Sequence, residues 1–213
     1  GGHLAGGKKA WLCYELPKSV KIGDLDSEAI KFYGFAHTAY DGTWKFGTAM
    51  SAIRVVCANT AAMAFSGAVS KWSTKHTKNA KNRIDEARKT LKLAYGYADT
   101  FEAEMNELLN GEFTKAQFEG MVKDLFPKTD SNDPAPFSRQ QYAMIGLLES
   151  SPTIPDEIRY TRWGALNAVT EYEGWGRRFN DTERPVAEKR TEHALFGKGA
   201  EAGQKVYNYL AKV

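Results

Sequence analysis

Basic residues gather in one stretch of the chain, next to a tryptophan. Between residues 71 and 92 there are eight lysines and arginines and only two acids. This mixture suits a single strand of nucleic acid, because lysines follow the phosphates while bases stack on an aromatic ring. The stretch also enters a predicted helix, whose N-terminus attracts anions. The structural alternative is a solvated helix face on which Asp85, Glu86 and Lys89 form local ion pairs.

We therefore expect a nucleic-acid site that joins this basic stretch to residues elsewhere in the chain. An arginine can hold a phosphate with two parallel hydrogen bonds, and a tryptophan can stack a base. The expected contacts are Arg54, Trp72, Lys75, His76, Lys78, Lys81 and Arg83. Secondary contacts are expected at Asn59, Arg177 and Arg178. A structural alternative remains for two of them, in which Arg54 pairs with an acid and Asn59 bonds the backbone.

The sequence carries none of the common motifs of catalysis or metal binding. Its four histidines, His3, His37, His76 and His193, are dispersed, and none forms a His-x-x-x-His pair. The glycines and lysines of residues 5–9 lack the spacing of a phosphate-binding loop. We expect a binding protein with no cofactor and no metal rather than an enzyme, although a fold can assemble a catalytic site from dispersed residues.

Composition indicates a globular chain, and its low cysteine content is consistent with a reducing compartment. The 213 residues are 42% hydrophobic and carry a net charge of +3, which permits nucleic-acid binding without arguing for it. No run approaches the roughly 20 apolar residues of a membrane helix, and no secretion signal opens the chain. Cys13 and Cys57 are too few for a disulfide framework, so we interpret them as small buried hydrophobes. The start, Gly1-Gly2-His3, is typical of a tag remnant or a trimmed boundary, and the natural N-terminus can lie further upstream.

The first third of the chain predicts β-structure. Residues 10–16 form an aromatic and apolar run that Pro17 closes, and residues 31–39 form a second such run. Asp41-Gly42 then gives a strong hairpin signal before a third run over residues 43–48. These runs predict a small antiparallel sheet.

The remainder predicts helices, because apolar residues recur at three- and four-residue steps from Ser51 onward. The first helix is expected from Ser51 to about residue 65, although the β-branched pair Val55-Val56 would let a strand persist to Cys57. Residues 72–77 are expected to be short extended structure or loop. Later helices are expected at residues 79–109, 114–127, 138–148, 161–179, from 182 onward, and 199–212. Thr114 and Gln117 have the spacing of a capping box.

These elements predict an α+β fold in one domain over residues 1–213. The small antiparallel sheet of hairpin strands, β-rich over residues 10–50, would pack on helices, with a helical C-terminal half. Within the helix expected at residues 161–179, Trp163 and Asn167 lie on one face. Aromatic residues at helical spacing are typical of a core, so Asn167 would need a buried hydrogen bond or a ligand.

Two blocks of the sequence resemble the signatures of the phage/plasmid-like proteins, a family with a domain of unknown function. The central block comprises Ile53–Thr60, Lys75–Asn79 and the helix that holds Arg83 to Ala87. The C-terminal block comprises Trp163–Tyr172, Trp175 and Arg178. The resemblance covers about residues 10–210. Thr60-Ala61 stands where the family usually has Thr-Leu, and the family's N-terminal portion is truncated here.

The resemblance implies a mobile-element origin and action in the cytoplasm of the bacterial host. The order of hairpin strands, then a helix, is also similar to the core of single-strand annealing proteins such as the RecT, Redβ and Erf types. We accordingly expect a protein that binds or anneals single-stranded DNA in recombination or replication, and that can form a homo-oligomer as annealing proteins do. The alternative is a non-enzymatic phage protein that binds a host bacterial protein through its aromatic helical half. No membrane partner is expected.

Overall fold

The N-terminal strands form one antiparallel sheet. The computed structural model describes the chain except residues 1, 5, 44, 55–58, 62–70, 75–88, 90–99, 131–132 and 181–183. The strands are β1 (Gly2–Leu4), β2 (Lys9–Lys21), β3 (Ala29–Ala39), β4 (Phe46–Arg54), β5 (Asn59–Ala61) and β6 (Lys71–Thr74). Their order is β1-β2-β3-β4-β5, and β6 also pairs with β4. The sheet, together with the helices that follow it, confirms the predicted α+β class.

The hairpin between β3 and β4 forms at the predicted Asp-Gly turn. The two strands pair from Ile30 opposite Arg54 to His37 opposite Gly47. Gly42 has a φ of 73°, which glycine adopts without strain. The Asp41 carboxylate accepts hydrogen bonds from the Thr43 hydroxyl and backbone N–H, at 2.6 and 3.0 Å, and these bonds lower the pKa of Asp41. Because the turn uses Thr43, the third strand begins at Phe46 instead.

Strand β2 continues through Pro17, where the sequence predicted that it would end. The β2–β3 register shifts between Glu15 and Ser19, so three residues of β2 lie opposite Phe32. A proline is tolerated at such an irregularity, because no regular ladder bond requires its missing N–H.

The helix predicted from Ser51 is wrong over the residues that the structure describes. Ser51 to Arg54 complete β4, and Asn59 to Ala61 form β5, antiparallel to β4. The three- and four-residue apolar spacing is outweighed here, because β4 pairs with β3 from Gly47 to Arg54 and gains a ladder of backbone hydrogen bonds. Residues 55–58 and 62–65 of this prediction lie outside the described part of the chain.

Most helices of the C-terminal half lie where the sequence predicted them. Residues 100–110 are helical and end the helix predicted at 79–109, most of which lies outside the described residues. The later helices are α2 (Lys115–Leu125), α3 (Arg139–Ser150), α4 (Asp156–Arg159), α5 (Arg162–Glu171), α6 (Val186–Phe196) and α7 (Lys198–Leu210). Capping boxes at Thr114–Gln117 and Ser138–Gln141 begin α2 and α3.

A π-helix replaces the end of the helix predicted at residues 161–179. Helix α5 stops at Glu171, and Tyr172–Gly176, labelled η4 below, continue as one π-helical turn. Such a turn widens the helix by one residue and is frequent at functional sites.

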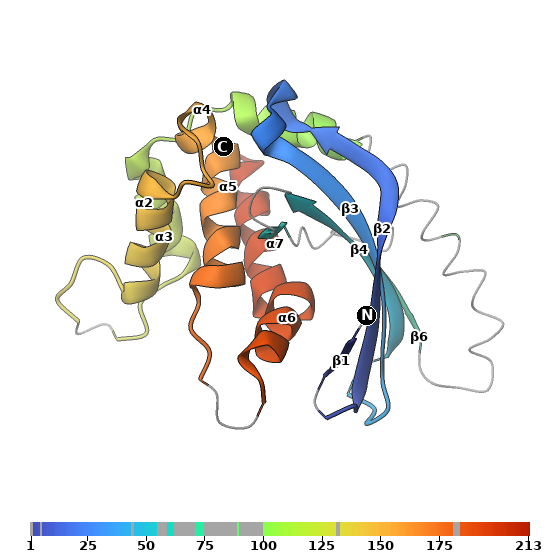
Figure 1. The fold of residues 1–213 in the computed structure, drawn as a ribbon. Coiled ribbons are helices and arrows are strands. Elements are labelled where there is room, and N and C mark those ends of the chain that lie inside the picture. The colour runs from blue at the N-terminus through green and yellow to red at the C-terminus, as the bar shows by residue number, and fades with distance from the viewer. Residues whose placement is uncertain are drawn as a thin grey trace.

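The hydrophobic core lies between the sheet and the helices. Figure 1 shows α5 and α7 between the curved sheet on one side and α2 and α3 on the other. Ile30, Phe32 and Ala52 of the sheet share one buried cluster with side chains of these helices. Phe32 meets Phe101 edge-to-face, with ring centroids 5.3 Å apart. The prediction of a single domain over the whole chain stays a prediction.

Buried polar groups join the helices to the β2–β3 connection. The Trp163 indole N–H donates to the Glu28 carboxylate at 2.7 Å, and both residues are fully buried. The Asn167 amide donates to the Trp163 carbonyl at 2.9 Å, which confirms the predicted buried hydrogen bond.

Cys13 is half-buried on β2, where burial raises the pKa of its thiol, and Cys57 lies outside the described residues.

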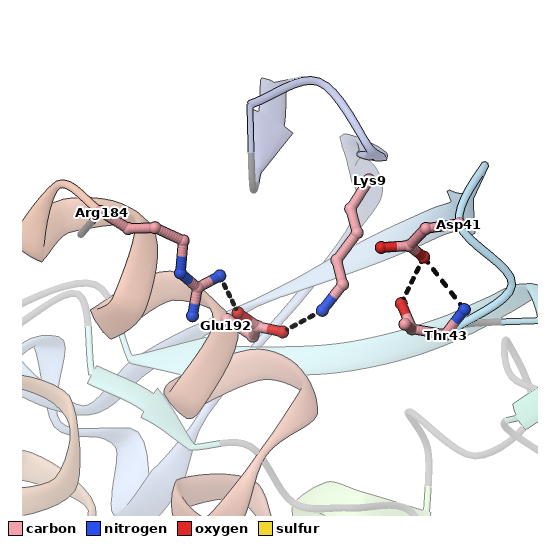
Figure 2. Close-up of polar contacts among 5 residues, drawn as sticks. All are labelled: Lys9, Asp41, Thr43, Arg184 and Glu192. Carbon is pink, nitrogen blue, oxygen red and sulfur yellow. Dashed lines mark hydrogen bonds and ion pairs between the residues drawn. The ribbon is translucent and has the colours of Figure 1, made fainter.

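An ion-pair bridge ties α6 to the sheet. Figure 2 shows Lys9 of β2 and Arg184 converging on Glu192 of α6, at 2.5 and 2.7 Å. Burial alone would raise the pKa of the Glu192 carboxyl, but the hydrogen bonds from Lys9 and Arg184 outweigh it and hold the pKa below its ordinary value. The bridge therefore favours a charged Glu192 between the two cations.

Candidate nucleic-acid interface

Two predicted contacts, Arg54 and Asn59, are brought together by the sheet. Arg54 ends β4, Asn59 begins β5, and the register makes them Cα partners. On its other side, Arg54 is the Cα partner of Ile30, which is fully buried. The sequence placed Arg54 and Asn59 on one helix, whereas in the structure they are opposite each other across two strands.

Trp72, the predicted stacking residue, lies on the same side of β4 as β5. It is the Cα partner of Thr48, and β6 flanks the first half of β4 while β5 flanks its end. Six residues separate Thr48 from Arg54, which is about 20 Å along a strand. The remaining predicted contacts lie outside the described residues: Lys75, His76, Lys78, Lys81 and Arg83.

The predicted secondary contacts Arg177 and Arg178 follow the π-helix. Arg177 Nη1 lies 3.4 Å from Glu173 Oε2, and the arginine side chain is 37% exposed. Arg178, the next residue along the chain, is exposed. Arg177 therefore has an internal acid partner and still reaches the surface.

A row of polar residues follows the exposed side of α7. Its members are Lys198, Glu201, Lys205, Asn208 and, just beyond the helix, Lys212, which recur at steps of three and four residues. The opposite side of α7 is buried and carries Gly199, Ala202, Gly203, Val206 and Leu210. Gly199, Ala202 and Gly203 are small, so α7 can pack closely against its neighbouring helices.

Two hollows border this row, between α7 and the end of α2. One of about 410 Å³ is lined by Leu125, Lys205, Asn208, Tyr209, Lys212 and Val213. The other, of about 260 Å³, has the polar lining Gln140, Glu173, Arg177, Lys198, Glu201 and Lys205. The two hollows share Leu125 and Lys205 in their linings, and we call them together the α7 groove.

Three lysines are spaced along the length of the α7 groove. Lys198, Lys205 and Lys212 are spaced seven residues apart, which spreads three cations over about 21 Å of helix. Tyr209 offers an aromatic ring beside Lys212 in the larger hollow. Cations in series beside an aromatic ring are the combination that single-strand binding requires.

A buried carboxylate lies in the smaller hollow of the α7 groove. Glu173, on η4, is 4% exposed. Its Oε1 accepts a hydrogen bond from Gln140 Nε2 at 3.3 Å, and its Oε2 lies 2.6 Å from His193 Nε2. Gly199 permits this contact, because a Cβ there would lie only 2.8 Å from the His193 ring. The π-helical turn thus holds an acid among residues of α3 and α6.

Sequence reasoning missed the lysines of α7 and the Glu173 cluster. The seven-residue spacing of Lys198, Lys205 and Lys212 was visible in the sequence as one side of a helix. The pairing of Glu173 with His193 was not, because it depends on a π-helical turn and on the corner between α6 and α7.

Comparison with known families decides the membership of the chain. The family described as Domain of unknown function (DUF932) matches residues 1–195. The chain belongs to the DUF932 family. Searches of curated proteins and of solved structures gave no match.

The DUF932 match covers one wall of the α7 groove and not the other. Gln140, Glu173 and Arg177 lie within the matched residues, whereas α7 and its lysines follow them. Within the described ranges, no helix combines the length and apolar character needed to cross a membrane. Nor do three potential metal ligands of the His, Cys, Asp or Glu type converge anywhere among those residues.

Proposed function

We propose that this DUF932 protein binds single-stranded DNA along the α7 groove. One observation carries the proposal: three lysines at seven-residue spacing line two hollows that share Leu125 and Lys205, and the larger hollow also contains an aromatic ring. Lysines neutralise phosphates without reading sequence, and a ring stacks any base. The groove therefore suits a strand held by its backbone.

The dimensions of the groove agree with several nucleotides. The lysine series extends over about 21 Å, and phosphates of one DNA strand in a duplex follow each other at about 3.4 Å. A strand of that rise would place about six phosphates along α7. Lysine side chains are long enough to reach phosphates on either side of the hollow.

The residues first predicted from the sequence would enlarge this surface. We propose that Arg54 and Trp72, with the basic stretch around Lys75 to Arg83, contact the same strand beyond the groove. On this proposal the protein serves recombination or replication of a phage or plasmid in the bacterial cytoplasm, as a single-strand binding or annealing protein. Self-association along the strand would follow the behaviour of such proteins.

Removal of the three lysines tests the proposal. We expect the Lys198→Ala, Lys205→Ala, Lys212→Ala variant to bind a labelled oligonucleotide of about 15 nucleotides more weakly. We also expect the slope of log K against log salt to flatten by about 2, because each single-strand phosphate contact contributes about 0.7. Fluorescence anisotropy over a salt series measures both quantities.

A variant with the same charge loss elsewhere serves as the control. Lys8, Lys21 and Lys45 are exposed at the ends of strands and do not line the groove. Their replacement by alanine should weaken binding much less than the α7 variant does. Failure of the unaltered protein to bind any oligonucleotide at about 50 mM salt would sink the proposal, because non-specific binding is strongest there.

A second candidate function is docking on a host protein. Tyr142, Tyr160 and Trp175 in the helical half are each about half exposed, and exposed aromatic residues are enriched in interface hot spots. Arg190 lies over the Trp175 ring at 5.2 Å, which fixes that ring at the surface. Capture of one host protein that persists after nuclease treatment, and is lost in Trp175→Ala, would favour this function.

A further inference from the structure

Hydrogen-bond acceptors collect in the smaller hollow of the α7 groove. The Glu173 carboxylate lines it, and among the residues that the structure describes only Gln140 donates to Glu173 Oε1, at 3.3 Å. A carboxylate has about four acceptor positions, so capacity remains at that oxygen. The Gln140 amide oxygen and the Glu201 carboxylate add further acceptors to the lining.

Cations share this hollow with the acceptors. Lys198, Lys205 and Arg177 also line this hollow. These cations can bind a phosphate, whereas the carboxylates of Glu173 and Glu201 would repel it. A ligand that satisfies both sets needs hydrogen-bond donors at one end and a phosphate at the other. A nucleotide whose base carries an amino group has this form.

The smaller hollow has room for one base. Its volume is about 260 Å³, which exceeds the space that a single pyrimidine base occupies. Unpaired bases are commonly splayed from a bound strand into pockets that contact their Watson–Crick edges.

We propose that this hollow takes one unpaired nucleotide of the bound strand and prefers bases with an exocyclic amino group, such as cytosine, over thymine. The inference rests on the proposed function, because the strand must already lie in the groove. The cytosine amino group donates to carboxylates. Thymine presents a carbonyl oxygen at the same place, which would leave Glu173 and Gln140 facing a second acceptor.

The test compares oligo-dC with oligo-dT of the same length, about 15 nucleotides. Both strands carry the same phosphates and small pyrimidine bases, so a difference in affinity reports the base edge. We expect oligo-dC to bind about tenfold more tightly, which is the worth of one hydrogen bond to a charged acceptor. Fluorescence anisotropy at one fixed salt concentration gives the ratio.

Two variants assign the preference to the hollow. Gln140→Ala removes one acceptor and should lower the affinity ratio, although the Glu173 carboxylate remains. Glu201→Gln removes a negative charge, so it should tighten oligo-dT binding while the ratio falls. Gln204→Ala is the matched control, because Gln204 lies on α7 outside the lining and donates to Asn208; its ratio should equal that of the unaltered protein.

Three other outcomes would contradict, in turn, the base preference, its location in the hollow and strand binding itself. Equal affinity of the unaltered protein for both oligonucleotides would overturn the base preference and leave strand binding in place. An affinity ratio that stays unchanged in both Gln140→Ala and Glu201→Gln would overturn its assignment to this hollow. Absence of binding to either oligonucleotide would overturn this inference together with the proposed function.

Discussion

At the residue scale, we expect the stability of the fold to depend on the hydrogen bond between Trp163 and Glu28. Both partners are fully buried, and they lie 135 residues apart in sequence. We expect Trp163→Phe to lower the free energy of unfolding by about 1–3 kcal/mol, because the buried carboxylate loses a donor and water cannot replace it. Urea unfolding followed by circular dichroism measures the change.

An exposed tryptophan provides the control for this substitution. Trp175 is 53% exposed, so Trp175→Phe removes an indole that water can solvate. A change within about 0.5 kcal/mol is expected there. If Trp163→Phe were equally mild, the Glu28 hydrogen bond would not contribute to stability as argued.

Some residue contacts could be predicted from the sequence, and others could not. Asn167 sits on an apolar helix face, and a buried amide needs a partner, so its hydrogen bond followed from its position alone. The Glu173–His193 contact joins two helices whose angle depends on packing around Gly199. No local sequence pattern encodes such an angle, so the position of Glu173 in the α7 groove could not be predicted from the sequence.

At the element scale, two helical glycines should respond in opposite ways to alanine. A Cβ at Gly164 would lie 2.1 Å from the Ile158 carbonyl oxygen, whereas a Cβ at Gly120 meets nothing within 4 Å. We expect Gly164→Ala to destabilise by at least about 1–3 kcal/mol, through overlap between α4 and α5. Gly120→Ala should stabilise by about 0.5–1 kcal/mol, because alanine favours the helix interior.

Thermal unfolding of the two glycine variants shows the sign directly. The melting temperature should fall for Gly164→Ala and rise for Gly120→Ala. A rise in both would mean that α4 can shift away from α5 without loss, contrary to the close packing described above.

The bridge between β2 and α6 predicts a pH dependence. Because Lys9 and Arg184 hold the pKa of Glu192 below its ordinary value, the stabilisation is present above the ordinary carboxyl pKa. It is lost as pH falls through the lower, folded-state pKa. Glu192→Gln should therefore be less stable than the unaltered protein at neutral pH, and the difference should shrink below about pH 4.

Urea unfolding at a series of pH values measures this difference. Glu157→Gln is the control, because Glu157 is exposed on α4, and its difference from the unaltered protein should not vary in the same way. A Glu192→Gln gap that stays constant down to about pH 3 would contradict the bridge.

Elements were predictable where local sequence and tertiary context agree. Thr114 and Gln117 begin a helix by a capping box that acts within one turn. Residues 51–54 carry apolar spacing of helical type, yet they pair with β3 from the far side of a hairpin. The partner strand, and not the local pattern, decides that segment, so the sequence alone gave the wrong structure.

At the scale of the whole molecule, one core joins sheet and helices. Phe32 of β3 and Phe101 of the helix at residues 100–110 are both fully buried and in edge-to-face contact. We expect Phe32→Ala to lower stability by about 3–5 kcal/mol. Because the core is shared, circular dichroism and tryptophan fluorescence should report one common urea transition that shifts as a whole.

Two separate transitions would contradict that expectation. If Phe32→Ala moved only a β-sheet transition and left the helical signal in place, the sheet and the helices would unfold as independent units. Tyr142→Ala, which removes an exposed ring from α3, is the control and should leave the midpoint nearly unchanged.

The lysine row of α7 also sets a direction. An α-helix advances 3.6 residues per turn, so a seven-residue step falls about 20° short of two full turns. From Lys198 to Lys205 the attachment points of the side chains consequently drift by about 20° around the helix axis. A polyanion that follows the lysines of α7 would therefore cross the helix obliquely, with a left-handed lead.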